Sequence, residues 1–151
     1  MKSFLTFLFL VFFMGFEEIA IFLNDRHPKG KLIEVGVGFN FKIAIKLKKL
    51  GREIIVVDWN PEAVKKAREF GLKACIDNIF SPNLTIYRGA EVIYSIRPTP
   101  ELIKPILELG KTLKIPVYIV PFSLDGMPRF LKLENYRGIP IYVWNPHQKD
   151  I

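Results

Sequence analysis

The stretch KLIEVGVGFNF, residues 31–41, places a short apolar run directly before two glycines that stand one residue apart. The run from Leu32 to Val35 is typical of a buried strand, and the pattern from about Phe41 to Leu50 is typical of an amphipathic helix. The glycines therefore lie in a tight turn between a strand and a helix. Such a turn either only reverses the chain or brings backbone N–H groups close to an anionic or polar ligand.

Strand and helix patterns alternate along the next part of the chain. Glu53 to Asp58 forms an apolar strand, residues 60–70 form a helix with Asn60 as its N-cap and Pro61 at its first position, and Leu72 to Ile76 forms a third strand. Strands that are apolar on both faces and alternate with helices predict a parallel sheet covered on both sides. The fold class is therefore α/β, Rossmann-like and doubly wound.

The second half of the chain departs from this rhythm. The segment after Asp77, DNIFSPNLTIYRG, is too short and too rich in turns for a full crossover helix, although Ala90 to Ile96 forms a fourth strand. Residues 99–114 supply another helix, which Pro105 starts late or kinks, and residues 115–120 supply a fifth strand. Two extended runs around the turn NYRG predict a terminal hairpin. We expect a mostly parallel sheet of about five parallel strands plus a C-terminal hairpin.

The length and composition of the chain restrict which classes of protein and which kinds of binding site can be expected. The 151 residues fit one domain with a buried core. Cys75 is the single cysteine and the two histidines are far apart, so we predict no disulfide and no metal site. The formal net charge of +7 favours a polyanion such as nucleic acid, although no motif that reads RNA or DNA accompanies it. Basic residues on predicted helices are also typical of a solvated surface.

The N-terminus needs separate treatment because the run FLTFLFLVFFMGF, from Phe4 to Phe16, is almost entirely apolar. It is shorter than the roughly 20 residues of a membrane-spanning helix, and no alanine before Ala20 offers a signal-peptide cleavage site. Residues 1–13 are then either an extension from a misassigned start upstream of Met14 or a membrane-proximal anchor. We expect residues 14–151 to form a single cytoplasmic domain.

The glycine turn fits one cofactor pattern better than another. The dinucleotide pattern Gly-x-Gly-x-x-Gly is met at Gly36 and Gly38, but Phe41 at its third position would obstruct close packing at a pyrophosphate. NAD is therefore the less favoured cofactor. EVGVGFN instead resembles Asp/Glu-x-Gly-x-Gly-x-Gly, the first motif of S-adenosylmethionine-dependent methyltransferases. Glu34 is then its acid, and Asn40, which tolerates left-handed backbone angles, replaces the last glycine.

Two further strand ends extend this cofactor hypothesis. Asp58 ends the second strand about 20 residues after Gly38, where an acid can accept hydrogen bonds from a ribose diol. The resemblance to methyltransferases implies that Glu34 orders the turn, that Asp77 bonds the adenine amino group and that a following apolar side chain packs on the ring. The candidates for cofactor binding are Glu34, Gly36, Gly38, Asn40, Asp58, Trp59, Asp77 and Ile79. In the alternative interpretation, the aspartates only cap helices or turns.

The loop after the fourth strand gives no catalytic assignment. Many amine-methylating enzymes carry Asn/Asp-Pro-Pro-Tyr there, whereas this chain has YSIRPTPE, residues 94–101, without the asparagine and the aromatic. Two prolines stiffen the loop, and Arg97 would contact a phosphate or carboxylate or pair with an acid such as Asp77. No nucleophile with an adjacent base is found. The substrate-proximal candidates are Ser95, Arg97, Pro98 and Glu101.

Four blocks spread along the chain resemble one small archaeal family. EVGVG, DNIF, VIYSIRPTPE and NYRGIPIYVW resemble uncharacterised protein family 0146 over residues 15–144. This resemblance implies a compact Rossmann-like fold that is related in outline to the methyltransferases, truncated, and without an assigned activity. The first hypothesis is a domain that binds S-adenosylmethionine or a related adenine nucleotide, with or without methyl transfer. The second is a non-enzymatic module that binds another nucleotide, a nucleic acid or a protein partner, in a homo- or hetero-oligomer.

Overall fold

The computed structural model describes residues 17–147, and the leader proposed for residues 1–13 lies outside them. In chain order the elements are a helix that includes residues 17–26, β1 (Lys31–Val35), α2 (Lys42–Lys49), β2 (Glu53–Asp58), α3 (Pro61–Glu69), β3 (Lys73–Ile76), the short 3-10 helix η1 (Leu84–Tyr87), β4 (Ala90–Ile96), α4 (Pro100–Leu113), β5 (Val117–Val120), β6 (Lys132–Tyr136) and β7 (Ile139–Trp144). Within the described part of the chain, no helix has the length and apolar character needed to cross a bilayer.

The strands form one seven-stranded sheet with the order β3-β2-β1-β4-β5-β7-β6. β1 to β5 pair in parallel, whereas β7 runs antiparallel to both β5 and β6. This arrangement confirms the predicted parallel sheet with a C-terminal hairpin. The chain order reverses between β1 and β4, and ligands of open α/β sheets bind beyond the carboxyl ends of the strands at such a point.

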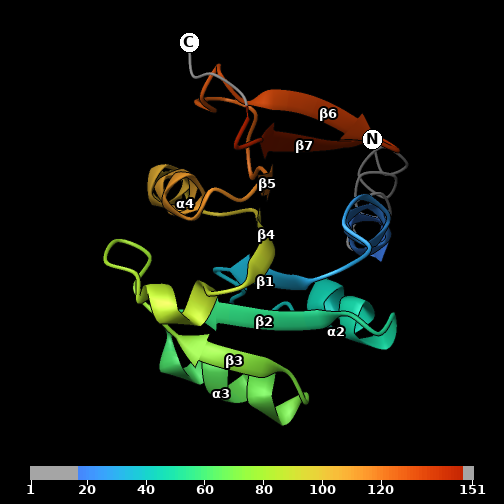
Figure 1. Cartoon of the computed structure of the whole chain (residues 1–151), viewed down its shortest axis with the longest axis vertical. Helices are drawn as coiled ribbons and strands as arrows, with labels where there is room; N and C mark the ends of the chain where they lie inside the picture. The colour runs from blue at the N-terminus through green and yellow to red at the C-terminus, as the bar shows by residue number, and fades with distance from the viewer. Residues whose placement is uncertain (1–16, 148–151) are drawn as a thin grey trace, which may run out of the picture.

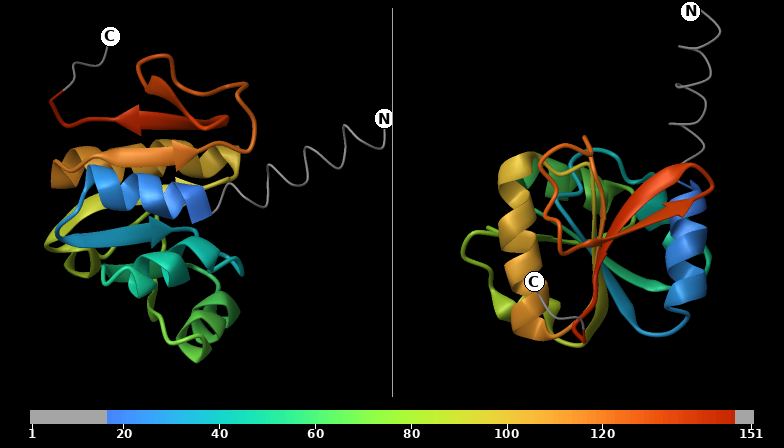
Figure 2. Two further views of the ribbon diagram at one scale, coloured as in Figure 1. Left: turned by 90° about the vertical axis from the view of Figure 1, so that its right-hand side faces the viewer. Right: turned by 90° about the horizontal axis from the view of Figure 1, so that it is seen from above.

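Helices cover the two faces of the sheet unequally (Figures 1 and 2). The helix over residues 17–26, α2 and α3 pack on one face, and α4 packs on the opposite face. Between β3 and β4 the chain forms only η1, as the turn-rich sequence of this segment predicted. Between β5 and β6 the described structure has no helix at all. The face that carries α4 is therefore covered partly by loops.

The first residues of α3 and α4 show how the local sequence positions two helices beside the candidate site. Asn60 caps α3 because its side-chain oxygen accepts a hydrogen bond from the N–H of Glu62 at 3.0 Å, and Pro61 is the first helical residue. α4 begins at Pro100, so Pro105 lies inside the helix and does not delay its start. Both helices begin directly after the carboxyl end of a strand, which places their first turns beside the candidate site.

Ion pairs join the first described helix to the C-terminal hairpin. Arg26 donates two hydrogen bonds to the carboxylate of Glu134 on β6, at 3.1 and 2.7 Å. Arg137, in the hairpin turn, donates to Glu18 at 2.8 Å. These pairs link segments more than 100 residues apart, so they hold the first helix against the hairpin end of the sheet.

Candidate functional site

The carboxyl ends of β1, β2 and β3 open onto one cavity of about 510 Å³. Gly36 follows β1, Asp58 ends β2 and Asp77 follows β3, and all three residues line this cavity. Parallel pairing of β1 with β2 and of β2 with β3 brings these strand ends side by side. The volume falls within the range of about 300 to 1,000 Å³ that small-molecule sites occupy.

Asp58 holds the glycine turn in place. Its side chain is only 8 % exposed, and its two oxygens accept hydrogen bonds from the N–H of Gly38 at 2.8 Å and of Asn60 at 2.9 Å. Gly36 and Gly38 have φ of +72° and +58°, a conformation that a residue with a side chain adopts only at a cost. An ionised carboxylate has about four acceptor positions, so Asp58 keeps acceptor capacity for the hydroxyl groups of a ligand.

Asp77 fixes the loop that replaces the crossover helix. One carboxylate oxygen accepts the N–H of Asn83 at 3.1 Å, and the other accepts the hydroxyl of Tyr87 at 2.7 Å. Burial, together with this hydrogen bond, raises the pKa of the Tyr87 phenol, so Tyr87 stays a donor. The loop is therefore anchored to the end of β3 by a carboxylate that also lines the cavity.

Large apolar side chains form the walls and rim of this cavity. Ile79 is buried in its wall, whereas Trp59 and Phe80 are 75 % and 62 % exposed. Exposed aromatic side chains beside a cavity supply flat surfaces for a ring, and grouped apolar exposure often marks a binding site. On the α4 side, Glu101 also lines the cavity and accepts the hydroxyl of Thr99 at 2.7 Å.

A second cavity, of about 300 Å³, lies against the same turn but on the other face of the sheet. Val37 and Ile43 line it and belong to the core beneath α2, whereas Val35, in the first cavity, belongs to the core beneath α4. Glu34 and Asn40 also line this second cavity. The residues proposed from sequence for one cofactor therefore divide between two cavities.

Glu34 is 2 % exposed and accepts the hydroxyl of Tyr94 at 2.8 Å. Burial is the main cause that raises the pKa of its carboxyl from 4.5 to about 8, and the nearby charge of Asp58 adds to it. The Gly38 N–H donates its hydrogen bond to Asp58 and not to Glu34, so Glu34 does not order the turn in the way the resemblance implied. Strongly perturbed acids inside cavities are candidates for function, although buried structural acids show the same shift.

The substrate-proximal candidates occupy different environments. Ser95 is fully buried and donates its hydroxyl to the Val35 carbonyl at 2.8 Å, which ties β4 to β1. Arg97 lines the second cavity, with its guanidinium 4.6 Å from the ring centre of Phe122. Pro98 lines a further cavity of about 410 Å³ between α4 and residues 122–130. Of these candidates, only Glu101 lines the cavity that holds Asp58 and Asp77.

Several lining residues carried no functional assignment from sequence. Tyr94 stands opposite Glu34 in the β1–β4 register, and the alternation of side chains along a strand would have paired them on one face. Phe80 continues the DNIF segment directly after Ile79 and could have been included with it. Phe122 lies in the loop after β5, where no local pattern indicates which side chains face a cavity.

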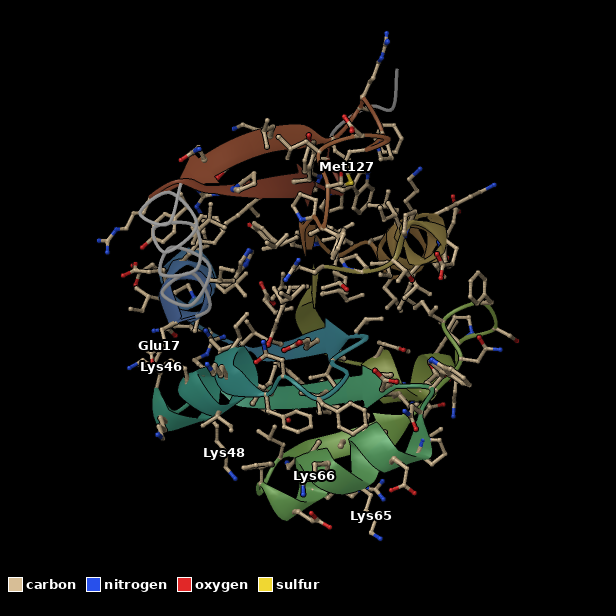
Figure 3. All side chains as sticks on the ribbon, turned by 180° about the vertical axis from the view of Figure 1, so that it is seen from behind. Glu17, Lys46, Lys48, Lys65, Lys66 and Met127 are labelled. Carbon is tan, nitrogen blue, oxygen red and sulfur yellow. The ribbon has the colours of Figure 1, made fainter. Side chains whose placement is uncertain are left out.

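The basic residues of the surface and the grouping of the acidic ones bear on which kinds of ligand the described part of the chain could bind. Lys65 and Lys66 on α3 lie on the exposed surface (Figure 3), and Lys48 on α2, also exposed, donates to the Gly71 carbonyl. Among residues 17–147, no three His, Cys, Asp or Glu side chains are grouped so that they could hold a metal ion. The polar side chains of the two cavities carry carboxylates, two amides, a hydroxyl, an indole N–H and a guanidinium, a set that suits an organic ligand.

Residues 16–145 match the Uncharacterised protein family (UPF0146). The chain belongs to this family. A UPF0146 protein of Pyrococcus abyssi is 50 % identical over 129 residues, which cover 85 % of this chain and 98 % of that relative. A UPF0146 protein of Methanocaldococcus jannaschii is 40 % identical over 128 residues, which cover 84 % of this chain and 91 % of that relative. The family expected from the four sequence blocks is confirmed.

Solved structures that resemble this UPF0146 protein are S-adenosylmethionine-dependent methyltransferases. An RNA methyltransferase from Salinibacter ruber in complex with S-adenosylhomocysteine has a TM-score of 0.66 and 17 % identity, with coverage of 88 % of this chain and 91 % of that one. A TehB-like methyltransferase from Corynebacterium glutamicum has a TM-score of 0.59 and 12 % identity, with coverage of 95 % and 96 %. At such low identity the likeness shows a shared fold, and function must be argued from the site.

Proposed function

We propose that this UPF0146 protein binds S-adenosylmethionine, or a related adenine nucleotide, in the cavity of about 510 Å³. The observation that carries the proposal is that a glycine turn and two aspartates, from three successive strand ends, line one open cavity. The sheet reverses its order beside this cavity, which is where ligands of open α/β sheets bind. The methyltransferase fold of the structural neighbours supports the same ligand class.

Each part of the ligand has a matching group in the cavity. The adenine ring would lie between Ile79 and the exposed indole of Trp59, and Asp77 would accept from its amino group. The ribose hydroxyls would donate to the acceptor positions that remain on Asp58. The methionine part would run along Gly36, where the absence of a side chain lets a ligand approach the backbone. When bound, S-adenosylmethionine would supply an electrophilic methyl group.

Cofactor binding without catalysis is the second candidate function. The connection between β3 and β4 holds only η1, and the chain from β5 to β6 forms no helix in the described structure. These short connections leave little material for an acceptor site around the cofactor. These short connections fit a binding module, or an enzyme whose acceptor site is completed by another subunit.

Calorimetric titration tests the proposal, with S-adenosylmethionine and S-adenosylhomocysteine as ligands and NAD as a comparison. Trp59→Ala should weaken binding by about 5- to 100-fold, because stacking of a base on an aromatic side chain contributes about 1–3 kcal/mol. Phe70→Ala is the matched control, since Phe70 is also an exposed aromatic next to α3, packs on Phe41 and does not line this cavity. Asp58→Ala is a poor test because it would also release the N–H groups of Gly38 and Asn60.

Tryptophan fluorescence gives an independent measurement. The chain has two tryptophans, of which Trp59 is exposed and Trp144 is buried in the core. Adenine stacked on Trp59 should quench its emission and protect it from acrylamide. Absence of binding at millimolar ligand by both methods, with an unchanged circular dichroism spectrum, would reject the proposal. Equal losses in Trp59→Ala and Phe70→Ala would reject the site.

A further inference from the structure

The cavity of about 300 Å³ on the α2 side of the glycine turn has the composition of a ligand site that the proposed cofactor does not use. Its polar groups are the Glu34 carboxyl, the Asn40 amide and the Arg97 guanidinium, and its remaining walls are apolar. Such a mixture, with a few convergent polar groups on apolar walls, is characteristic of pockets for small organic groups. A volume of this size accommodates one planar ring system with its substituents.

One oxygen of Glu34 is open to this cavity. Tyr94 donates to Oε1, and among the described residues no buried side-chain oxygen or nitrogen lacks a hydrogen-bond partner. The Tyr94 hydroxyl occupies Oε1 of Glu34, so Oε2 is the oxygen that we assign to a ligand in the cavity that Glu34 lines. The raised pKa of this carboxyl, caused mainly by burial, keeps it largely protonated near pH 7. It can therefore donate as well as accept a hydrogen bond at the edge of a ring.

The opposite wall of the cavity offers a flat surface. Phe122 is 68 % exposed, and the Arg97 guanidinium lies over its ring at 4.6 Å. Arg97 has a φ of +52°, a strained conformation for a residue with a side chain, and its N–H donates to the Val120 carbonyl at 2.6 Å. The backbone is thus fixed so that a guanidinium and an aromatic ring stand together at the cavity. Aromatic and guanidinium planes are the surfaces on which unstacked nucleobases lie.

A second exposed aromatic ring lies near the cavity. Phe39, in the glycine turn, is next to the lining residue Asn40 and is also largely exposed. A free mononucleotide would need only the cavity, whereas a strand would place neighbouring bases on outer rings such as Phe39. The net charge of +7 adds a general attraction for a phosphate backbone. These two features favour a polynucleotide over a free base.

We propose that this second cavity binds a nucleobase of a single-stranded nucleic acid, with the edge of the base at Glu34 and Asn40 and its face on Phe122 and Arg97. Base binding here does not require a cofactor in the first cavity, so each proposal is tested separately. A base in this position would lie across the glycine turn from the proposed cofactor. Because a protonated carboxyl donates one hydrogen bond and accepts another, it can pair with the ring nitrogen and the amino group of adenine or cytosine, or with the N–H and carbonyl of uracil.

The test is fluorescence anisotropy of labelled 12-nucleotide strands of A, of C and of U, with the purified full-length chain at 50 and 200 mM salt. Phe122→Ala should weaken binding of the A and C strands by about 5- to 100-fold. Phe70→Ala, which removes an exposed ring that does not line this cavity, should leave it unchanged. Glu34→Leu, which removes both the donor and the acceptor at the base edge, should weaken binding more than Glu34→Gln, which keeps one of each. AMP and CMP titrations show whether the base is taken without a strand.

The outcomes separate the alternatives. Absence of binding of any strand at 100 μM protein and 50 mM salt would overturn the proposal. Binding that Phe122→Ala and Phe70→Ala weaken equally would also overturn it, because charge alone would then hold the strand. AMP or CMP binding as tight as that of the strand would keep the nucleobase site and reject the polynucleotide. None of these results depends on whether S-adenosylmethionine binds.

Discussion

Replacing Glu34 by glutamine should change how the stability of the protein depends on pH. Burial raises the pKa of the Glu34 carboxyl from 4.5 to about 8 in the folded protein. Between these two values the folded state holds a proton that the unfolded chain has released. Stability therefore falls as pH rises through this window and becomes independent of Glu34 above about pH 8. Glutamine is neutral throughout and keeps an oxygen that can accept the Tyr94 hydroxyl.

The size of the effect follows from this proton. Each pH unit within the window costs about 1.4 kcal/mol of unfolding free energy, so the loss between pH 5 and pH 8 is about 4 kcal/mol. Glu34→Gln should remove this loss, and its stability relative to the unmodified protein should rise by a similar amount over the same range. Burial lowers the pKa of His27, but His27 is present in both proteins and cancels in the comparison.

The assay is guanidinium unfolding followed by circular dichroism at pH 5, 6, 7 and 8. Glu101→Gln is the matched control, because Glu101 is exposed and a hydrogen bond from Thr99 lowers the pKa of its carboxyl. This control should not show the rise with pH. Parallel stability curves for Glu34→Gln and the unmodified protein between pH 5 and 8 would refute the reasoning, because Glu34 would then be ionised at no cost in the fold.

Three further substitutions test the packing, the surface and the turn. Gly110→Ala should lose about 1–3 kcal/mol in thermal unfolding, because its Cβ would lie 2.2 Å from a methyl group of Val117, and adding Val117→Ala should restore part of the loss. A double-mutant cycle of Arg26→Ala and Glu134→Ala should give a coupling of about 0.5–1 kcal/mol that shrinks in 1 M salt, since Arg26 is half exposed. Gly38→Ala should cost roughly 1–2 kcal/mol through its φ of +58° alone, because nothing lies within 4 Å of the added Cβ. A loss above about 4 kcal/mol there, measured by the same unfolding assay, would contradict a purely conformational cost.

The order of the elements followed from the sequence because the central strands β1, β2, β4 and β5 are largely buried on both faces. Such strands show as uninterrupted apolar runs, for example Glu53 to Asp58. Where an amphipathic helix connects two such runs, the chain is expected to return across the sheet, so that the two strands pair in parallel. The hairpin could be predicted for a different reason, since the turn NYRG joins two extended runs directly and Gly138 there has a φ of +87°.

The division of the candidate residues between two cavities could have been deduced as well. Glu34 and Val35 are neighbours on a strand, so their side chains must point to opposite faces of the sheet. Val35 lines the first cavity, and Glu34 therefore lines the second. Grouping Glu34 with the aspartates by motif ignored this alternation.

The partners of the two aspartates could not be read from the sequence. The bonds from Asp58 to Gly38 and from Asp77 to Tyr87 join residues 20 and 10 positions apart, through turns whose shape depends on packing. The exposure of Phe122 likewise depends on how the loop after β5 crosses the end of the sheet. Such contacts leave no periodic pattern in the sequence, because each is made once and is not repeated along a helix or a strand.

The bonds of Asp58 determine how the first cavity would respond to a ligand. Both carboxylate oxygens already hold backbone N–H groups, so the turn at Gly38 and the start of α3 at Asn60 are fixed before anything binds. A ligand hydroxyl would add to acceptor positions that remain, without displacing these bonds. Binding then needs no ordering of the turn, which lowers its entropic cost. A short chain with few loops around its strand ends can in this way present a formed site without additional structural elements.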